Sequence, residues 1–196
     1  MKKTSTRDNL INAMTDALQR KGLHGVGLNE LLDIAGAPKG SLYHHFPGGK
    51  SELAVAAIER ISERIDSLFA QLFSHQPDPL NAMHSWLQGA LQQLESSGFE
   101  RGCPLATIAL ESSADDVEIR AALQRSFNAV RQALSRQLRA HGYADEQAEN
   151  LAALFVAIYE GGLLQARVAG SSEPLRRAAT ALFNLAREQF PGGVRP

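Results

Sequence analysis

The stretch LNELLDIAGAPKGSLYHHF, residues 28–46, decides the fold of this chain. Its first part has apolar residues at the spacing that lines one face of an α-helix. These residues are Leu28, Leu31, Leu32 and Ala35. Gly36 favours the left-handed conformation that ends a helix, and Pro38 cannot continue one but suits the first turn of the next. We therefore predict two short helices joined by a tight turn, with the second starting near Pro38.

The second predicted helix has one apolar side and one polar side. Leu42 and Phe46 lie four residues apart, so both can be buried against the first helix. The remaining side chains would lie on or near the other faces, and they are Lys39, Ser41, Tyr43, His44 and His45. This arrangement has the form of a helix-turn-helix whose second helix enters the DNA major groove. Spacing alone would also fit a pair of short helices in any all-α domain.

The residue types in the segment are more specific than the spacing of its apolar positions. Its distinctive features are Ala35-Gly36, the run Lys39-Gly40-Ser41-Leu42-Tyr43, the pair His45-Phe46, and Lys50 followed by an acidic residue and Leu53. In this combination the first sixty residues closely resemble the N-terminal DNA-binding domain of the TetR/AcrR family of bacterial transcriptional repressors. The entry Gly27-Leu28-Asn29 and the exit Pro47-Gly48-Gly49-Lys50 are most similar to the LmrA/YxaF-like branch.

The resemblance implies DNA contacts at seven positions, which are Asn29, Lys39, Gly40, Ser41, Tyr43, His44 and Lys50. Cations and hydroxyls bind phosphates, and a lysine can also reach guanine acceptors. Gly40 would let the backbone approach DNA closely, and Lys50 would sit at a helix N-terminus, which favours anions. Two alternatives stay open: Tyr43 could pack beneath its helix, and His45 could have only a structural role.

The rest of the chain also has helical periodicity, which predicts an all-α fold of about nine helices. We expect an N-terminal three-helix DNA-binding domain over residues 4–64, with its helix-turn-helix at about 28–47. A long fourth helix would link it to a helical ligand-binding and dimerisation domain over residues 75–190. The two prolines within 74–79 favour a boundary there.

The charge, the cysteine content and the apolar stretches of the chain limit which classes of function are possible. The net charge of the chain is only -1. Residues 1–50 hold seven Lys and Arg against four Asp and Glu, so positive charge gathers where DNA would bind. The lone cysteine, Cys103, excludes an internal disulfide and favours a reducing compartment. No stretch approaches the roughly 18 apolar residues that a membrane span needs. We expect a cytoplasmic protein with no membrane partner.

Enzyme chemistry finds little support in the sequence. Gly49-Lys50-Ser51 resembles the end of a phosphate-binding P-loop, but His44 stands where that motif needs its first glycine. No nucleophile elbow, telling carboxylate pair or His-Glu-x-x-His run is present. We therefore predict no enzyme activity, no catalytic residue, no metal site and no cofactor.

The second domain offers an apolar interior dotted with polar groups, which suits an apolar or aromatic small molecule. Candidate ligand contacts are Trp86, Cys103, Glu111, Phe127, Phe155 and Tyr159. Any of them could instead be ordinary core. Cys103 lies before Pro104 at a predicted helix start and near Arg101, which would favour its thiolate. It could be a sensor of electrophiles or oxidants, or a small residue packed at a helix cap.

The last two predicted helices are rich in alanine and glycine, which lets helix axes approach closely. In TetR-like proteins the final two helices form the dimer interface, although an intramolecular bundle would need the same residues. We therefore expect a homodimer that binds a palindromic operator in double-stranded DNA, most often as a repressor, and that a small apolar or aromatic inducer releases. The alternative is an all-α small-molecule-binding or thiol-reactive sensor protein without sequence-specific DNA binding.

Overall fold

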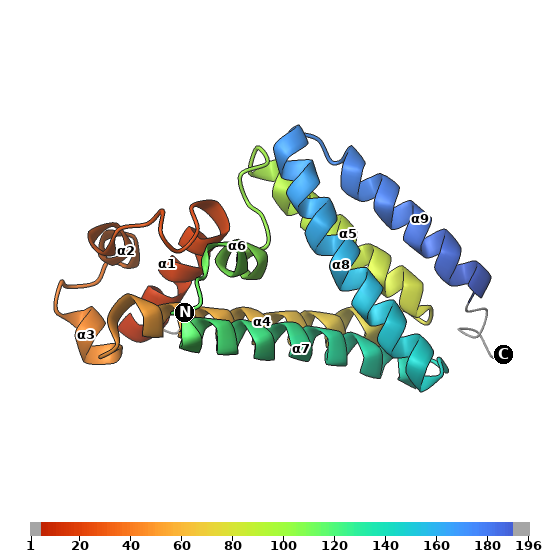
Figure 1. The fold of residues 1–196 in the computed structure, drawn as a ribbon, viewed down its shortest axis with the longest axis horizontal. Helices are drawn as coiled ribbons and strands as arrows, with labels where there is room; N and C mark the ends of the chain where they lie inside the picture. Colours follow the sequence, from red (N-terminus) through yellow and green to blue (C-terminus); the bar gives the residue numbers. More distant parts are fainter. Residues whose placement is uncertain (1–4, 190–196) are drawn as a thin grey trace. The chain divides into compact units, whose positions relative to one another are not determined.

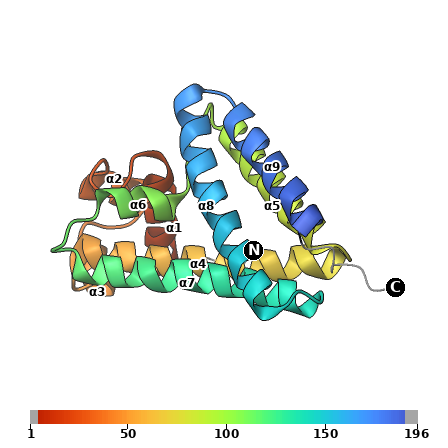
Figure 2. The same cartoon turned by 45° about the vertical axis from the view of Figure 1, so that its right-hand side comes forward.

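Residues 5–189 are described by the computed structural model, and within that range the chain forms nine α-helices and no strand (Figures 1 and 2). The predicted all-α class is therefore confirmed. Residues 4 and 190, the outer limits of the two predicted domains, lie outside the described range.

The helices gather into two compact units. Unit 1 comprises residues 1–63 and 103–127, and unit 2 comprises residues 64–102 and 128–196. The long helices α4 and α7 each contribute to both units. The domain limits 4–64 and 75–190 stay a prediction, since residues 103–127 group with the N-terminal part of the chain.

Unit 1 is built around the first helix. Its elements are α1 (Thr6–Arg20), α2 (Leu28–Ala35), α3 (Ser41–His45), the first part of α4 (Gly49–His75), α6 (Pro104–Glu111) and the first part of α7 (Val117–Ala140). Helix α1 packs against α2, α3 and α6. Fully buried apolar side chains from these helices form the core, including Leu10, Met14, Leu31, Leu42 and Phe46.

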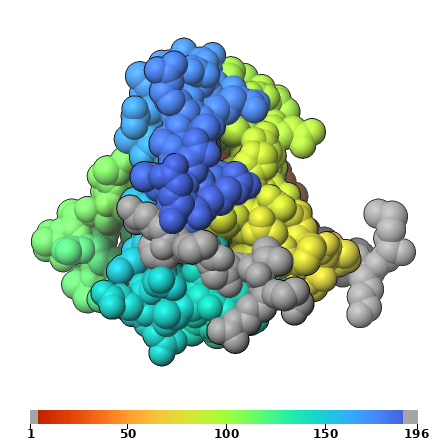
Figure 3. All heavy atoms as spheres, turned by 90° about the vertical axis from the view of Figure 1, so that its right-hand side faces the viewer, coloured from red at the N-terminus to blue at the C-terminus, as the bar shows by residue number. Residues whose placement is uncertain are grey.

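Unit 2 is a helical bundle. It contains the remainders of α4 and α7 together with α5 (Pro79–Ser96), α8 (Asp145–Ala169) and α9 (Glu173–Gln189). Helices α8 and α9 pack along each other, and both also contact α5 (Figures 1 and 2). Figure 3 shows α9, in dark blue, lying at the surface of this unit.

Local sequence signals set most helix ends. Gly36 ends α2 with a φ of 59°, a left-handed conformation that glycine adopts without strain. Asp78 caps α5 by accepting a hydrogen bond from Leu80 N at 2.9 Å. Ala144 occupies the N-cap position of α8, and Gln147 Oε1 accepts the Ala144 N–H. The next residue, Asp145, pairs with Arg139 at 2.7 Å.

Helix α8 is the one helix in residues 5–189 that is long and apolar enough to cross a membrane by length and composition. The sequence alone did not suggest this. A core helix of a folded bundle has the same properties, and α8 buries Leu151, Phe155 and Leu163 within unit 2. We therefore attribute the high hydropathy of α8 to its position in the core of the helical bundle.

Candidate nucleic-acid interface

The turn between α2 and α3 positions the candidate DNA-contacting residues. Ser41 donates to Pro38 O through both its backbone N–H, at 2.9 Å, and its hydroxyl, at 2.6 Å. The segment from Pro38 to Gly40 is therefore a turn, and α3 begins at Ser41. The predicted start near Pro38 is three residues too early, because the turn closes before the helical hydrogen bonds start.

Helix α3 has a buried side and an exposed side. Leu42 is fully buried and Phe46 is 1% exposed, as the sequence predicted. Tyr43 is 59% exposed, so the alternative that it packs beneath the helix is wrong. The exposed set among the predicted contacts also includes Asn29, Lys39, Gly40 and His44. Unit 1 thus exposes polar groups from α2, from the turn that follows it and from α3.

Neighbouring groups hold the outer side chains of α3 in place. The Tyr43 ring lies beside Gly49, where an added Cβ would be 3.4 Å from Tyr43 Cε1. The rings of His44 and His45 meet edge to face, with centroids 4.8 Å apart. Half-buried His45 fits the structural role considered for it. Arg7 places its guanidinium 5.2 Å from the centroid of the Phe46 ring, and this cation was not identified from the sequence.

The Lys50 side chain does not point outward toward a phosphate, as the sequence had suggested. Its ammonium donates a 2.6 Å hydrogen bond to Val26 O, so it points into unit 1. Burial lowers the Lys50 pKa, and the charge of Glu111 partly opposes that shift. The N-terminus of α4 is already capped, because Glu52 accepts the Gly48 N–H at 2.7 Å. A phosphate contact at Lys50 would have to share its ammonium with Val26.

The cations of unit 1 differ in how far they are neutralised. Lys21 pairs with Glu30 at 2.5 Å, and this contact holds the pKa of Glu30 below its usual value. Arg60 pairs with Asp8 at 2.8 Å. Among the described residues Lys39 has no ion-pair partner. Its charge is therefore available to an external anion, which is what DNA contact requires.

Glu111 is a correction to the predicted ligand site. Its carboxylate accepts hydrogen bonds from Leu23 N at 2.5 Å and from His24 N at 3.2 Å. The side chain therefore fixes the connection that leads from α1 to α2. This contact could not be predicted from the sequence, because Glu111 is far along the chain from Leu23 and His24 and bonds their backbone groups.

The six predicted ligand residues do not all belong to one unit. Trp86, Phe155 and Tyr159 are in unit 2, while Cys103, Glu111 and Phe127 are in unit 1. In unit 2 the ring centroid of Trp86 lies 4.5 Å from that of Phe69 and 5.8 Å from that of Tyr159. Trp86 Nε1 is buried and has no hydrogen-bond partner among the described residues. This aromatic cluster is the part of the predicted ligand site that the structure brings together.

Cys103 precedes α6 and is only 6% exposed. Its carbonyl accepts hydrogen bonds from the backbone and the hydroxyl of Thr107, at 3.1 and 2.9 Å. These features support a packed residue at a helix cap, because reactive thiols are accessible. A sensor role for Cys103 stays a prediction. Within residues 5–189 no three His, Cys, Asp or Glu side chains form a group that could hold a metal ion.

Family comparisons cover both ends of the chain. Residues 10–57 match the family described as bacterial regulatory proteins, tetR family. Residues 79–181 match the family described as transcriptional regulator LmrA/YxaF-like, C-terminal domain. Both families consist of transcriptional regulators.

Individual relatives agree with these matches. The chain is 30% identical over 180 residues to the HTH-type transcriptional regulator LmrA of Bacillus subtilis (strain 168), covering 92% of this chain and 96% of LmrA. It is 28% identical over 188 residues to the HTH-type transcriptional repressor NemR of Escherichia coli (strain K12), covering 92% and 93%. The crystal structure of a TetR regulatory protein from Rhodobacter sphaeroides superimposes with a TM-score of 0.80 at 28% identity, covering 92% and 98%.

Proposed function

Because the chain belongs to the TetR family of transcriptional regulators, in its LmrA/YxaF-like branch, we propose that it is a ligand-responsive repressor. It binds a palindromic operator as a homodimer, and a small apolar or aromatic inducer releases it. The proposed site of action is the cytoplasm. The observation that carries the proposal is the two-sided arrangement of α3 and its flanking residues. Leu42 and Phe46 are buried, whereas Lys39, Tyr43 and His44 are exposed.

The proposed DNA contacts are those of the outer surface of unit 1. Lys39 binds phosphate or a guanine edge, Tyr43 and Ser41 bind phosphate oxygens, and Gly40 lets the backbone come close. Asn29 and His44 contact DNA from α2 and α3. Lys50 contributes if its ammonium binds a phosphate while keeping Val26 O, since an ammonium has three donors.

Dimerisation through α8 and α9 is supported by apolar residues that unit 2 leaves at its surface. On α8 these recur at the alternating spacing of three and four of a helix-pairing seam, and they are Leu154, Ala157, Gly161, Leu164 and Val168. On α9 the set is Ala178, Ala181 and Leu185. Val168 is 83% exposed and Leu164 is 52% exposed. A second copy would bury this seam and place two α3 helices on successive major grooves.

The inducer site is proposed at the aromatic cluster of Trp86 and Tyr159, with Phe155 beside it in the core of unit 2. The unpaired Trp86 Nε1 supports this placement, because a buried donor without an acceptor is rare and would be satisfied by a polar atom of a ligand. An inducer acts by preferring a conformation in which the two α3 helices are wrongly spaced. Helix α4 carries the signal, since it starts in unit 1 and ends in unit 2.

A mobility-shift titration tests the proposal, with DNA from the promoter region of the protein's own gene. The parent protein should shift this DNA, and the double variant K39A/Y43A should not. The matched control is R125Q, which removes an exposed cation of unit 1 that pairs with Glu59. In the single variant K39A, losing the Lys39 phosphate contact should reduce the salt dependence, lowering the magnitude of the slope of log K against log salt by about 0.9 for each protomer. Equal binding by the parent and the double variant would refute the site.

A further inference from the structure

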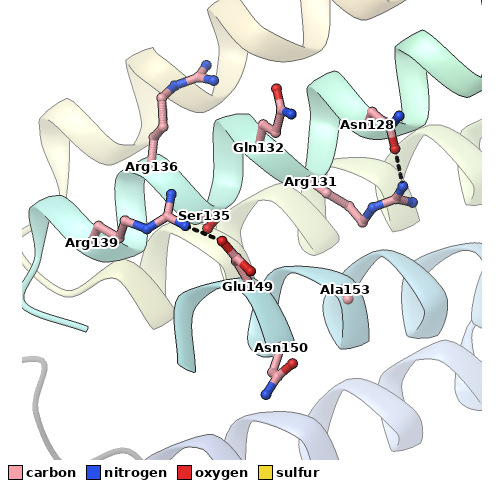
Figure 4. A pocket seen from close by; sticks show the side chains of 9 residues that line it. All are labelled: Asn128, Arg131, Gln132, Ser135, Arg136, Arg139, Glu149, Asn150 and Ala153. Carbon is pink, nitrogen blue, oxygen red and sulfur yellow. Dashed lines mark hydrogen bonds and ion pairs between the residues drawn. The ribbon is translucent and has the colours of Figure 1, made fainter. Parts of the chain in front are cut away.

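A polar groove lies between α7 and α8 within unit 2 (Figure 4). Its volume is about 630 Å³, within the range of about 300–1,000 Å³ that small-molecule sites occupy. The side chains that matter here are Asn128, Arg131, Ser135, Arg139, Glu149 and Asn150. It shares no residue with the aromatic cluster of unit 2, so a ligand in this groove would be distinct from the proposed inducer.

Ser135 supplies a buried polar atom without a partner. The residue is 3% exposed, and its hydroxyl has no hydrogen-bond partner among the described residues. Such groups are rare in folded proteins, and each calls for an explanation such as a bound ligand. Ser135 lines the groove, but its hydroxyl oxygen has almost no accessible surface, so it bonds with a molecule that enters there once the groups that cover it move aside.

The three arginines of the groove are not equivalent. Arg136 pairs with Asp66 on α4 at 3.1 Å, and Figure 4 shows its side chain pointing away from α8. Arg139 is neutralised by Asp145 at 2.7 Å and by Glu149 at 2.6 Å. Arg131, one helical turn before Ser135, bonds only the neutral amide of Asn128 within the described part of the chain. Its positive charge is therefore uncompensated by any carboxylate.

We propose that this groove binds a small oxyanion, with the anionic oxygens on Arg131 and a further polar oxygen of the same ligand on Ser135. A guanidinium presents parallel N–H donors that match a carboxylate or a phosphate. The amides of Asn128 and Asn150 border the groove and can bind additional polar atoms of the ligand. The chemistry fits a hydroxycarboxylate or a phosphate. This site does not depend on DNA binding or on the apolar inducer.

Isothermal titration calorimetry of the full-length protein tests this site, with malate in one arm and inorganic phosphate in the other. Both arms use sodium chloride at matched ionic strength as the blank. At least one probe should bind saturably, and the responding arm identifies a carboxylate or a phosphate ligand. R131Q should weaken that binding about tenfold or more, and S135A should weaken it as well. R136Q is the matched control and should bind like the parent.

Three results would overturn the proposal. The first is the absence of saturable binding of either probe up to about 10 mM. The second is equal binding by R131Q and R136Q, which would mean that general surface charge is responsible. The third is parent-like binding by S135A. Circular dichroism verifies that each variant is folded, and if R131Q does not fold, the milder S135A decides the question.

Discussion

The Glu111 carboxylate accepts a 2.5 Å hydrogen bond from the backbone N–H of Leu23, 88 residues earlier in the chain. This contact ties the last residue of α6 to the segment between α1 and α2. Space around it is tight, since a Cβ added to Gly22 would clash with Glu111 Oε1. Together with the Lys50 hydrogen bond to Val26 O, this contact holds the segment that leads into the helix-turn-helix.

Removing this carboxylate should weaken both folding and DNA binding. In E111A the N–H groups of Leu23 and His24 lose their acceptor, and the free energy of unfolding should fall by about 1–2 kcal/mol. Urea denaturation measures the loss, and a mobility shift measures DNA affinity. E118A is the control, because Glu118 is an exposed carboxylate of the same unit with no side-chain partner in the described range. Parent-like stability of E111A would show that the contact is dispensable.

Two glycines near α3 should respond differently to the same change. Gly49 has a φ of 69°, so G49A should lower the free energy of unfolding by about 1 kcal/mol. Gly40 has a φ of -80° and nothing within 4 Å of an added Cβ. G40A should therefore fold with parent-like stability but bind operator DNA less tightly, because its methyl group meets the DNA backbone. Thermal unfolding and mobility shifts separate the two effects, and reversed effects would contradict the assignment.

Charges placed on the α8 seam should prevent dimerisation. L164E/V168E puts two carboxylates where a second copy would bury apolar side chains, and burying an unpaired charge is costly. Analytical ultracentrifugation should then find monomers, with operator binding lost. L110E is the control, since Leu110 is 75% exposed but lies in unit 1. A dimeric double variant would place the interface elsewhere.

Acid should destabilise the turn before α7 through Asp116. Hydrogen bonds from the backbone and the hydroxyl of Ser113 hold the pKa of Asp116 below its model-peptide value of 3.8. The folded state therefore binds fewer protons, so this contribution to stability is complete above pH 3.8 and is lost as the pH falls through the lower folded pKa. Urea unfolding over a pH series should show a weaker acid dependence in D116N than in the parent. An acid dependence in D116N equal to that of the parent would contradict this role of Asp116.

Local signals account for what the sequence predicted well. Gly36, Pro79 and Pro104 mark helix ends through backbone conformations that act within a few residues. The period of the apolar residues likewise predicted that Leu42 and Phe46 are buried. The start of α3 was misplaced because the turn at Pro38 is stabilised by Ser41, a contact that periodicity does not encode.

Long-range contacts explain what the sequence did not predict. Glu111 was assigned to a ligand site because its backbone partners at Leu23 and His24 leave no mark in the sequence. Lys50 was expected to face phosphate, whereas Val26 O receives its ammonium. Arg131 and Ser135 were not identified from the sequence, because only the position of α8 makes them the wall of a groove.

Helix α3 has a further consequence for how such a protein can diversify. Of its five residues only Leu42 is buried, and Phe46 follows directly as the second anchor. Substitutions at the exposed positions Tyr43 and His44 therefore leave the core untouched, so new operator preferences can arise there without a penalty in folding. A bacterial lineage that duplicates this gene could assign the copy to a new promoter by changing a few exposed side chains.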